Sequence, residues 1–419
     1  MTVTTETDVL IVGGGPAGAL LGTLLARRGI RVLVAERQTS FEREFRGETL
    51  AAPSAVSLRR LGFEPALKAH GYLETNSVTM RMEGRKVLYV DYRRFAIGAL
   101  PIDIPQPSLI GIFHDAATAL PSFSYASGAA FTDLVIEGGV VRGALLKQPD
   151  GSRVEVRSRL VVGADGRFSK VRKSAGLEAE VTPMARDFLS FKLPRPADWG
   201  NDAELIADGD KHIMVLPTFP DFLRIGHNLP KRGLAELRRN GFRSFRDGIA
   251  ALDPRLAPLM EKHLTSWDDT SFLEIFTAEL GRWSRDGLIL IGDASHTCTP
   301  ILGQGVNVAL QDSVCLTPVI ARALAETPAG GVVREDQLAA FVEQRRTHKN
   351  FVTKFQRMQE AALAQSTPAQ KVLRRWRYRV LDKLPVKYRL FDKVINAPHE
   401  IDPVDLELAA RAPVPAPAQ

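Results

Sequence analysis

The sequence predicts an α/β protein built around a Rossmann-like unit, and three observations support that fold class. A short apolar strand at 8–12 is followed by a glycine-rich turn, a helix at about 17–28 and a second strand at 30–35. Two later apolar stretches, at 159–163 and 287–292, each end in a glycine that is followed within two residues by an aspartate. Strands that alternate with helices in this way favour a parallel sheet with helices on its faces.

The composition is that of a globular chain rather than a disordered one. The 419 residues are 45% apolar and 25% charged, and this length favours two or three structural units. Two cysteines, Cys298 and Cys315, are too few for a disulfide framework, so we expect a reducing, cytoplasmic location. The eight histidines are scattered and no Cys-x-x-Cys occurs, so no metal site is predicted.

The net charge of +7 is concentrated near the C-terminus. Residues 345–393 hold fourteen Lys or Arg and three acidic residues, whereas the rest of the chain is mildly acidic. Since no recognised nucleic-acid-binding fold accompanies this charge, we expect no nucleic-acid partner. The uncharged run at 9–26 is broken by Gly-Gly-Gly-Pro and has an acidic flank, so we expect neither a membrane span nor a signal peptide there.

That break forms a motif typical of dinucleotide binding. Gly13, Gly15 and Gly18 give GxGxxG between the first strand and the helix. The first glycine permits a tight turn, the second lets a pyrophosphate approach the backbone, and the third lets helix and strand pack closely. The helix start offers unpaired N–H groups to the phosphates. Glu36, eighteen residues after Gly18 at the end of the second strand, is suited to accept ribose hydroxyls.

Two later segments repeat the pattern of a buried strand that ends near an aspartate. The segment 159–172 combines a strand, an acidic turn at Asp165 and a basic helix start. The segment 287–296 holds a buried strand that ends in Gly-Asp at Asp293, where one carboxylate can accept the hydroxyls of a sugar-like chain. A glycine-led helix start follows at 303–307, which again presents N–H groups and a positive dipole end, and this helix carries Asp312.

These three motifs, in this order, resemble the class A flavoprotein monooxygenases, the para-hydroxybenzoate hydroxylase family. The resemblance covers roughly the first 330 residues and implies a Rossmann-like FAD-binding domain interleaved with a β-sheet substrate domain, plus C-terminal helices. The expected segments are FAD-binding parts at 1–71, 106–179 and 282–330, substrate-domain parts at 72–105 and 180–281, a helical region at 331–400 and a flexible tail at 401–419.

The resemblance also implies roles for individual residues. The FAD pyrophosphate is expected at the first glycine loop, the adenosine ribose at Glu36, the ribityl chain at Asp293 and the isoalloxazine at the second glycine-led helix start. Arg46 and Pro300 are expected at the reaction pocket, and no general base is assignable. The full set of expected cofactor-binding residues is Gly13, Gly15, Pro16, Ala17, Gly18, Glu36, Arg37, Arg46, Gln106, Asp165, Gly292, Asp293, Gly303, Gly305, Val306 and Asn307.

The resemblance further implies that NAD(P)H reduces the flavin and that O2 then adds at flavin C4a. The resulting hydroperoxide transfers OH to an aromatic or polyketide-like small molecule. Only one GxGxxG occurs, so the nicotinamide cofactor is expected to bind transiently, and NADPH or NADH remains open. Candidate residues for the substrate pocket are His212, Met214, Phe222, His227 and Tyr89.

Proteins of the same fold also have other activities, which are alternatives for this chain. The Trp-x-Trp-x-Ile-Pro segment of flavin halogenases is absent, which argues against halogenation. A reductase of the geranylgeranyl-reductase type is the main enzymatic alternative, and a non-catalytic FAD-fold escort protein is a third. The oligomeric state is open.

The segment 370–384 is predicted to form an amphipathic helix. Its apolar face would carry Val372, Leu373, Trp376, Val380, Leu381 and Leu384, with Arg374, Arg375, Arg377 and Lys383 elsewhere. One interpretation is peripheral contact with a membrane or a lid for a lipophilic substrate. The other, which we favour from sequence, is a helix packed on the domain with a solvated basic edge.

Overall fold

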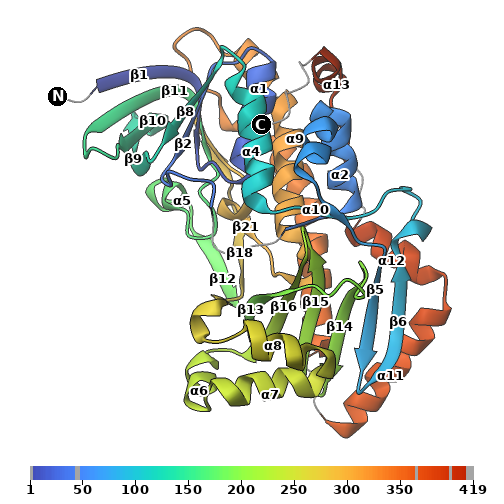
Figure 1. Cartoon of the computed structure of the whole chain (residues 1–419). Helices are drawn as coiled ribbons and strands as arrows, with labels where there is room; N and C mark the ends of the chain where they lie inside the picture. Colours follow the sequence, from blue (N-terminus) through green and yellow to red (C-terminus); the bar gives the residue numbers. More distant parts are fainter. Residues whose placement is uncertain (1–2, 43–47, 364–366, 396–398, 412–419) are drawn as a thin grey trace.

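A computed structural model describes residues 3–42, 48–363, 367–395 and 399–411. It confirms the predicted α/β class: two large sheets form two lobes joined by long helices (Figure 1). The predicted strand 8–12 extends over β1 (Val3–Val12), and the predicted helix is α1 (Pro16–Arg27). The second strand is β2 (Val32–Glu36).

The larger sheet has eight strands and carries the glycine motifs. Its central strands β11 (Arg153–Gly163), β1, β2 and β8 (Phe123–Ser127) run parallel, so their carboxyl ends lie at one edge. Side chains such as Leu10 and Ile11 are fully buried, in one hydrophobic core with side chains of α1 and of the strands at 130–137 and 140–147. The remaining strands are β9 (Ala130–Glu137), β10 (Val140–Lys147), β19 (Ser284–Arg285) and β20 (Leu288–Leu290).

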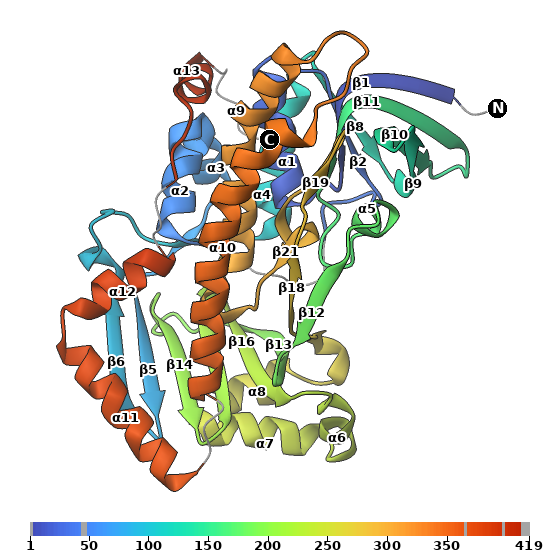
Figure 2. The same cartoon turned by 180° about the vertical axis from the view of Figure 1, so that it is seen from behind.

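The second lobe is a seven-stranded sheet with a helix layer on each face. Its strand order is β17 (Thr270–Leu273), β13 (Arg186–Pro194), β16 (Phe222–Pro230), β15 (Lys211–Thr218), β14 (Ala203–Asp208), β5 (Ser77–Met82) and β6 (Arg85–Asp91). One face packs on α7 (Phe242–Leu252) and α8 (Ala257–His263), and the other on α10 (Glu335–Leu363), as Figures 1 and 2 show from opposite sides.

Two small three-stranded sheets connect the lobes. One is β12 (Ala179–Pro183), β18 (Phe276–Leu280) and β21 (His296–Thr297); the other is β3 (Thr49–Leu50), β7 (Ile102–Asp103) and β4 (Leu73–Glu74). The other helices are α2 (Ala52–Leu58), α3 (Glu64–His70), α4 (Gln106–Thr118), α5 (Lys170–Ser174), α6 (Leu234–Arg239), α9 (Gln304–Glu326), α11 (Pro368–Lys383), α12 (Val386–Ile395) and α13 (Pro403–Arg411).

Helix α9 links the two lobes through the protein interior. The segment Ile301–Glu326 is long and apolar enough to span a membrane, but 67% of its most apolar window is buried inside the protein. It packs against α1 on one side and α10 on the other. This helix is therefore part of the core, and its start lies between the two large sheets.

The flexible tail predicted for 401–419 is wrong for its first part. Residues 403–411 form α13, which packs against α1 and the turn of helix at 59–63. Arg28 Nε donates to the buried Asp405 at 2.6 Å, and its Nη2 donates to Asp402 at 2.8 Å. The sequence offers no signal for this long-range pairing. The Ala-Pro run at 412–419 lies outside the described residues.

Helix α11 packs on β6, as the interpretation that we favoured from sequence required. However, it turns a polar side toward the domain and much of its apolar side toward solvent. Arg374, which we assigned to the solvated side, is buried together with Tyr378. Trp376 and its apolar neighbours face solvent instead. The physical reason is a set of polar contacts made by Arg374, described below.

Candidate functional site

The loop between β1 and α1 has the shape that a pyrophosphate requires. Gly13 has φ +109°, and a Cβ there would lie 2.4 Å from the carbonyl oxygen of Ala164. A Cβ on Gly18 would lie 1.9 Å from the carbonyl oxygen of Gly13. A Cβ on Gly15, in contrast, would have no neighbour within 4 Å, so this glycine faces open space. Two glycines are thus needed for packing, and the third leaves room for a ligand.

The first turn of α1 adds positive potential to that space. Pro16 stands at its first position, Ala17 follows, and no side chain caps the helix. The N–H groups of this turn are therefore available to an anion. Glu36, at the end of β2, is buried and accepts hydrogen bonds from the N–H groups of Gly14 at 2.8 Å and Gln38 at 3.0 Å. Its carboxylate lies beside the loop, and Arg37 next to it is exposed.

Three distant segments of chain meet behind this loop. Ser313 Oγ of α9 donates to the carbonyl of Ala17 at 2.8 Å. Arg172 Nη1 of α5 donates to the carbonyl of Ala294 at 3.0 Å. Since Gly13 also packs on the backbone of Ala164, all three sequence motifs contact one another around one space at the edge of the large sheet.

Asp165 holds the second motif in shape. Its Oδ1 accepts from Ser169 Oγ at 2.5 Å, and its Oδ2 accepts from the N–H groups of Lys170 at 2.7 Å and Val171 at 3.1 Å. The carboxylate therefore caps α5. A direct contact of Asp165 with a cofactor stays a prediction.

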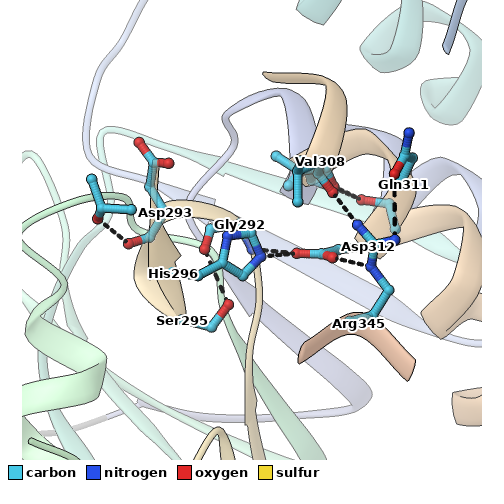
Figure 3. Close-up of polar contacts among 12 residues, drawn as sticks. Gly292, Asp293, Ser295, His296, Val308, Gln311, Asp312 and Arg345 are labelled. Carbon is cyan, nitrogen blue, oxygen red and sulfur yellow. Dashed lines mark hydrogen bonds and ion pairs between the residues drawn. The ribbon is translucent and has the colours of Figure 1, made fainter. Parts of the chain in front are cut away.

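Asp312 holds the third motif in shape, and its side chain lies between His296 and Arg345 (Figure 3). Its Oδ2 accepts from the N–H of Gly292 at 2.9 Å and pairs with His296 Nε2 at 2.8 Å. Its Oδ1 accepts from Arg345 Nε of α10 at 2.6 Å. Figure 3 shows the Asp293 side chain pointing away from this cluster. The buried carboxylate thus fixes the turn that presents Asp293.

Asp312 and His296 each stabilise the charged form of the other. Burial alone would lower the pKa of His296, but the Asp312 carboxylate raises it to about 9. Burial alone would raise the pKa of Asp312, but His296 and Arg345 lower it to about 2. We therefore treat Asp312 as ionised and His296 as protonated at neutral pH. Arg345 also donates to the carbonyl of Val308 at 3.0 Å, so the cluster ties α9 to α10.

The start of α9 offers a second open, positively polarised helix end. Cβ atoms on Gly303 and Gly305 would have no neighbour within 4 Å, and no side chain caps the helix. Val306 lies in this first turn. Asn307 is buried; its Oδ1 accepts from the N–H of Ala51 at 2.8 Å, and its Nδ2 donates to the carbonyl of Thr49 at 3.2 Å. Asn307 therefore joins the helix start to the strand at 49–50.

The loop before α9 carries backbone strain. Leu302 has φ +63°, which is uncommon for a residue with a branched side chain and often marks a functional site. Gln356 of α10 holds this loop: its Nε2 donates to the carbonyls of Thr299 at 3.0 Å and Ile301 at 2.7 Å. Pro300, between them, is exposed.

A cavity lies between this loop and the seven-stranded sheet. It is small in this structure, with a volume of about 10 Å³ accessible to a water-sized molecule. Its walls come from β13, β15, the 299–301 loop and the end of α10. The lining residues are Arg186, Phe188, His212, Ile275, Thr299, Ile301, Glu360 and Leu363.

Comparisons with known proteins decide the family. Residues 6–356 match the family described as FAD binding domain. A protein of Streptomyces rimosus named 6-methylpretetramide 4-monooxygenase is 36% identical over 361 residues, which cover 84% of each chain. The chain is an FAD-dependent monooxygenase of class A.

One further relative and one solved structure are similar to this chain. A Rhodococcus jostii (strain RHA1) protein named "Probable NADH-specific resorcinol 4-hydroxylase" is 24% identical over 394 residues, covering 90% of this chain and 71% of its own. The crystal structure of p-nitrophenol 4-monooxygenase PnpA from Pseudomonas putida DLL-E4 shares the fold, with TM-score 0.76 and 19% identity over 94% of this chain and 99% of that one.

The cofactor FAD is therefore confirmed, and the residues present fit it. The open glycines of the two helix starts leave space beside unpaired N–H groups. Glu36 lies beside the first of these loops, and the Asp293 side chain points away from the Asp312 cluster (Figure 3). Gln106, at the first position of α4, lies two residues after Ile104, whose N–H donates to the backbone carbonyl of Glu48. Arg46 lies outside the described residues, so its place in the monooxygenase stays a prediction.

The structure separates the five predicted pocket residues. Register places Met214 opposite Leu205 and Gly226, on the sheet face that meets α10, and His212 lies two residues away on the same face. Phe222 is on this face too, but at the exposed strand start. His227 pairs with Ile213 on the opposite face, where its ring packs on Phe245.

Tyr89 pairs with Thr79 and also lies away from the cavity, with its N–H bonded to Asp382 of α11. Among the five, only His212 lines the cavity of the monooxygenase. Sequence reasoning missed Gln356, Arg345 and Glu360, all on α10. Nothing in a single sequence distinguishes them from the other polar residues of that helix.

We predict that Gly15→Val gives a folded monooxygenase without FAD. The valine would fill the open space above the loop, whereas the negative φ of Gly15 tolerates a side chain. The measurement is flavin absorbance per chain after purification, alongside the circular dichroism spectrum. Gly248→Val, at an equally open position in α7, is the control and should keep its flavin. Full flavin content in Gly15→Val would remove the loop from the cofactor site.

We predict that the holoenzyme loses stability as the pH rises above neutrality. The raised pKa of His296 means that its pairing with Asp312 stabilises the fold fully below about pH 6.5 and that this contribution is lost as the pH rises through about 9. The melting temperature should fall by several degrees over that interval. His296→Gln should remove most of this fall in melting temperature. His70→Gln, a control at an exposed site, should show the same fall as the wild type. An equal fall in melting temperature for wild type and His296→Gln would contradict the assignment of a protonated His296 paired with Asp312.

Proposed function

We propose that this monooxygenase hydroxylates an aromatic or polyketide-like small molecule, with NAD(P)H as reductant and O2 as oxidant. The observation that carries the proposal is the 36% identity, over 84% of each chain, to the protein named 6-methylpretetramide 4-monooxygenase. The cavity between the seven-stranded sheet and the 299–301 loop, directly before the open start of α9, is the place we propose for the substrate. The relatives named for 6-methylpretetramide and for resorcinol support this substrate class. We place the enzyme in the cytoplasm, because both cysteines are free and buried.

Bound FAD would take two electrons from NAD(P)H and activate O2 for transfer of one oxygen atom. The chain's own task is to hold and shield the reactants. The side chains of Phe188, Ile275, Ile301 and Leu363 give the cavity apolar walls. Such walls exclude water, which protects a reactive oxygen species from side reactions. Gln356 keeps the loop that closes the cavity in place.

Two polar groups of the cavity suit a phenolic or enolic hydroxyl. His212 Nδ1 and Glu360 Oε2 are buried and have no hydrogen-bond partner within the described part of the chain. Burial, with the nearby His227 and Arg186, lowers the pKa of His212 to about 3, so its imidazole is neutral at physiological pH. Burial raises the pKa of Glu360. A substrate hydroxyl that donates to either group satisfies it and increases electron density on the ring.

The decisive experiment measures NADPH and NADH oxidation by the holoenzyme across a panel of phenols, anthraquinones and larger polycyclic polyketides under ¹⁸O2. We predict that a polycyclic phenol stimulates oxidation and yields a product with one added ¹⁸O atom. A product that gains hydrogen and no oxygen would identify a reductase and overturn the proposal.

Glu360→Gln tests the cavity within the same assay. It should lower kcat/KM for the best substrate by about tenfold, since a hydrogen bond to a charged group contributes about 1.5–3 kcal/mol. Glu343→Gln, an exposed position on the same helix, is the control and should be neutral. Unchanged kinetics in Glu360→Gln would place the substrate elsewhere.

A further inference from the structure

Helix α11 exposes its apolar side. Val372, Leu373 and Trp376 are 57%, 55% and 62% exposed, and Val380 one turn later is 37% exposed. At 100° per residue these four side chains fall on one stripe of the helix. A helix on the surface of a globular domain ordinarily turns such a stripe inward, so this orientation needs a cause and points to a partner.

The cause is a polar anchor on the opposite side. The Arg374 side chain, 1% exposed, donates to the carbonyls of Leu363 at 3.3 Å and Gly209 at 3.0 Å, and it pairs with Glu83 at 3.5 Å. Tyr378 Oη, one turn on, donates to Gln359 at 2.9 Å.

Asp382, a further turn along α11, accepts from the N–H of Tyr89 at 2.8 Å. Contacts at 374, 378 and 382 therefore clamp the polar side of α11 to the domain, and the apolar side faces outward.

Helix α12 continues the exposed surface. Val386 and Leu390 are exposed, as is Leu384 between the helices. Both views of the molecule show α11 and α12 at its outer edge beside β6 (Figures 1 and 2). We call this set the C-terminal apolar surface: Val372, Leu373, Trp376, Val380, Leu384, Val386 and Leu390.

Positive charge surrounds the C-terminal apolar surface. The exposed charged side chains described between residues 368 and 395 are all basic: Arg377, Arg379, Lys383, Arg389 and Lys393. The two acidic residues of this segment are half-buried, and Asp382 is paired with Lys387 at 2.7 Å. The surface thus combines an apolar stripe with a border whose exposed charges are all positive.

We propose that the C-terminal apolar surface docks the enzyme on an anionic membrane, with the apolar side chains inserted at the headgroup level. A tryptophan and aliphatic side chains bordered by Arg and Lys are the features of interfacial helices. A second copy of this chain is a poor occupant, because two identical cationic borders would repel each other.

Docking would bring the substrate cavity close to the lipid. Arg374 binds the carbonyl of Leu363, whose side chain lines the cavity, so α11 and the cavity wall are directly connected. Lipophilic molecules dissolved in the membrane would then have a short path to the site. The docking itself does not depend on the proposed hydroxylation.

The test is flotation of the purified holoenzyme with vesicles. We expect binding to vesicles of phosphatidylcholine with phosphatidylglycerol, weak binding to vesicles of phosphatidylcholine alone, and loss of binding at high salt. The double variant Leu373→Ser/Trp376→Ser should bind the anionic vesicles at least about tenfold more weakly. Because both side chains are exposed, flavin content and melting temperature should stay at wild-type values.

Ile136→Ser/Val181→Ser removes two exposed apolar side chains from other surfaces and should bind like the wild type. Equal binding by Leu373→Ser/Trp376→Ser and wild type, equal binding to both vesicle types, or no flotation at all would overturn the proposal. So would a wild-type dimer in sedimentation velocity that Leu373→Ser/Trp376→Ser converts to a monomer, because a second copy would then cover the surface.

Discussion

The buried carboxylate of Asp312 is the interaction on which the cofactor site depends. One oxygen binds the Gly292 N–H and His296, and the other binds Arg345. These contacts join the turn before Asp293, the core helix α9 and the long helix α10 at one buried point. A buried charge without partners is strongly destabilising, so each group of this cluster constrains the others. The position of Asp293, which we expect to face the flavin, follows from that constraint.

Steric limits fix the shape of the β1–α1 loop. Gly13 and Gly18 leave no room for a Cβ, whereas Gly15 faces outward. The β1–α1 loop therefore packs closely against Ala164, and open volume is left at Gly15, where we expect the pyrophosphate. Together with the cluster around Asp312, this explains how segments about 150 residues apart in sequence shape a single FAD site.

The fold class and the cofactor could be predicted from sequence because both rest on local patterns. Strand, glycine turn and helix are adjacent in the chain, and each glycine has a steric task that its neighbours define. The pocket residues could not be predicted in the same way. His212 and His227 lie on strands with similar patterns, and only the register shows that they occupy opposite faces. Arg374 is buried by carbonyl groups of distant segments, which an amphipathic pattern does not reveal.

The affinity of Asp312→Asn for FAD tests this account most directly. The amide keeps the size of the side chain, but its NH2 would face His296 or Arg345, and the buried positive charges would lose their counter-ion. Titration calorimetry of the apoprotein with FAD should show at least about tenfold weaker binding, with the fold retained, while the exposed-site control Asp336→Asn should bind like the wild type. Wild-type affinity in a folded Asp312→Asn variant would contradict the account.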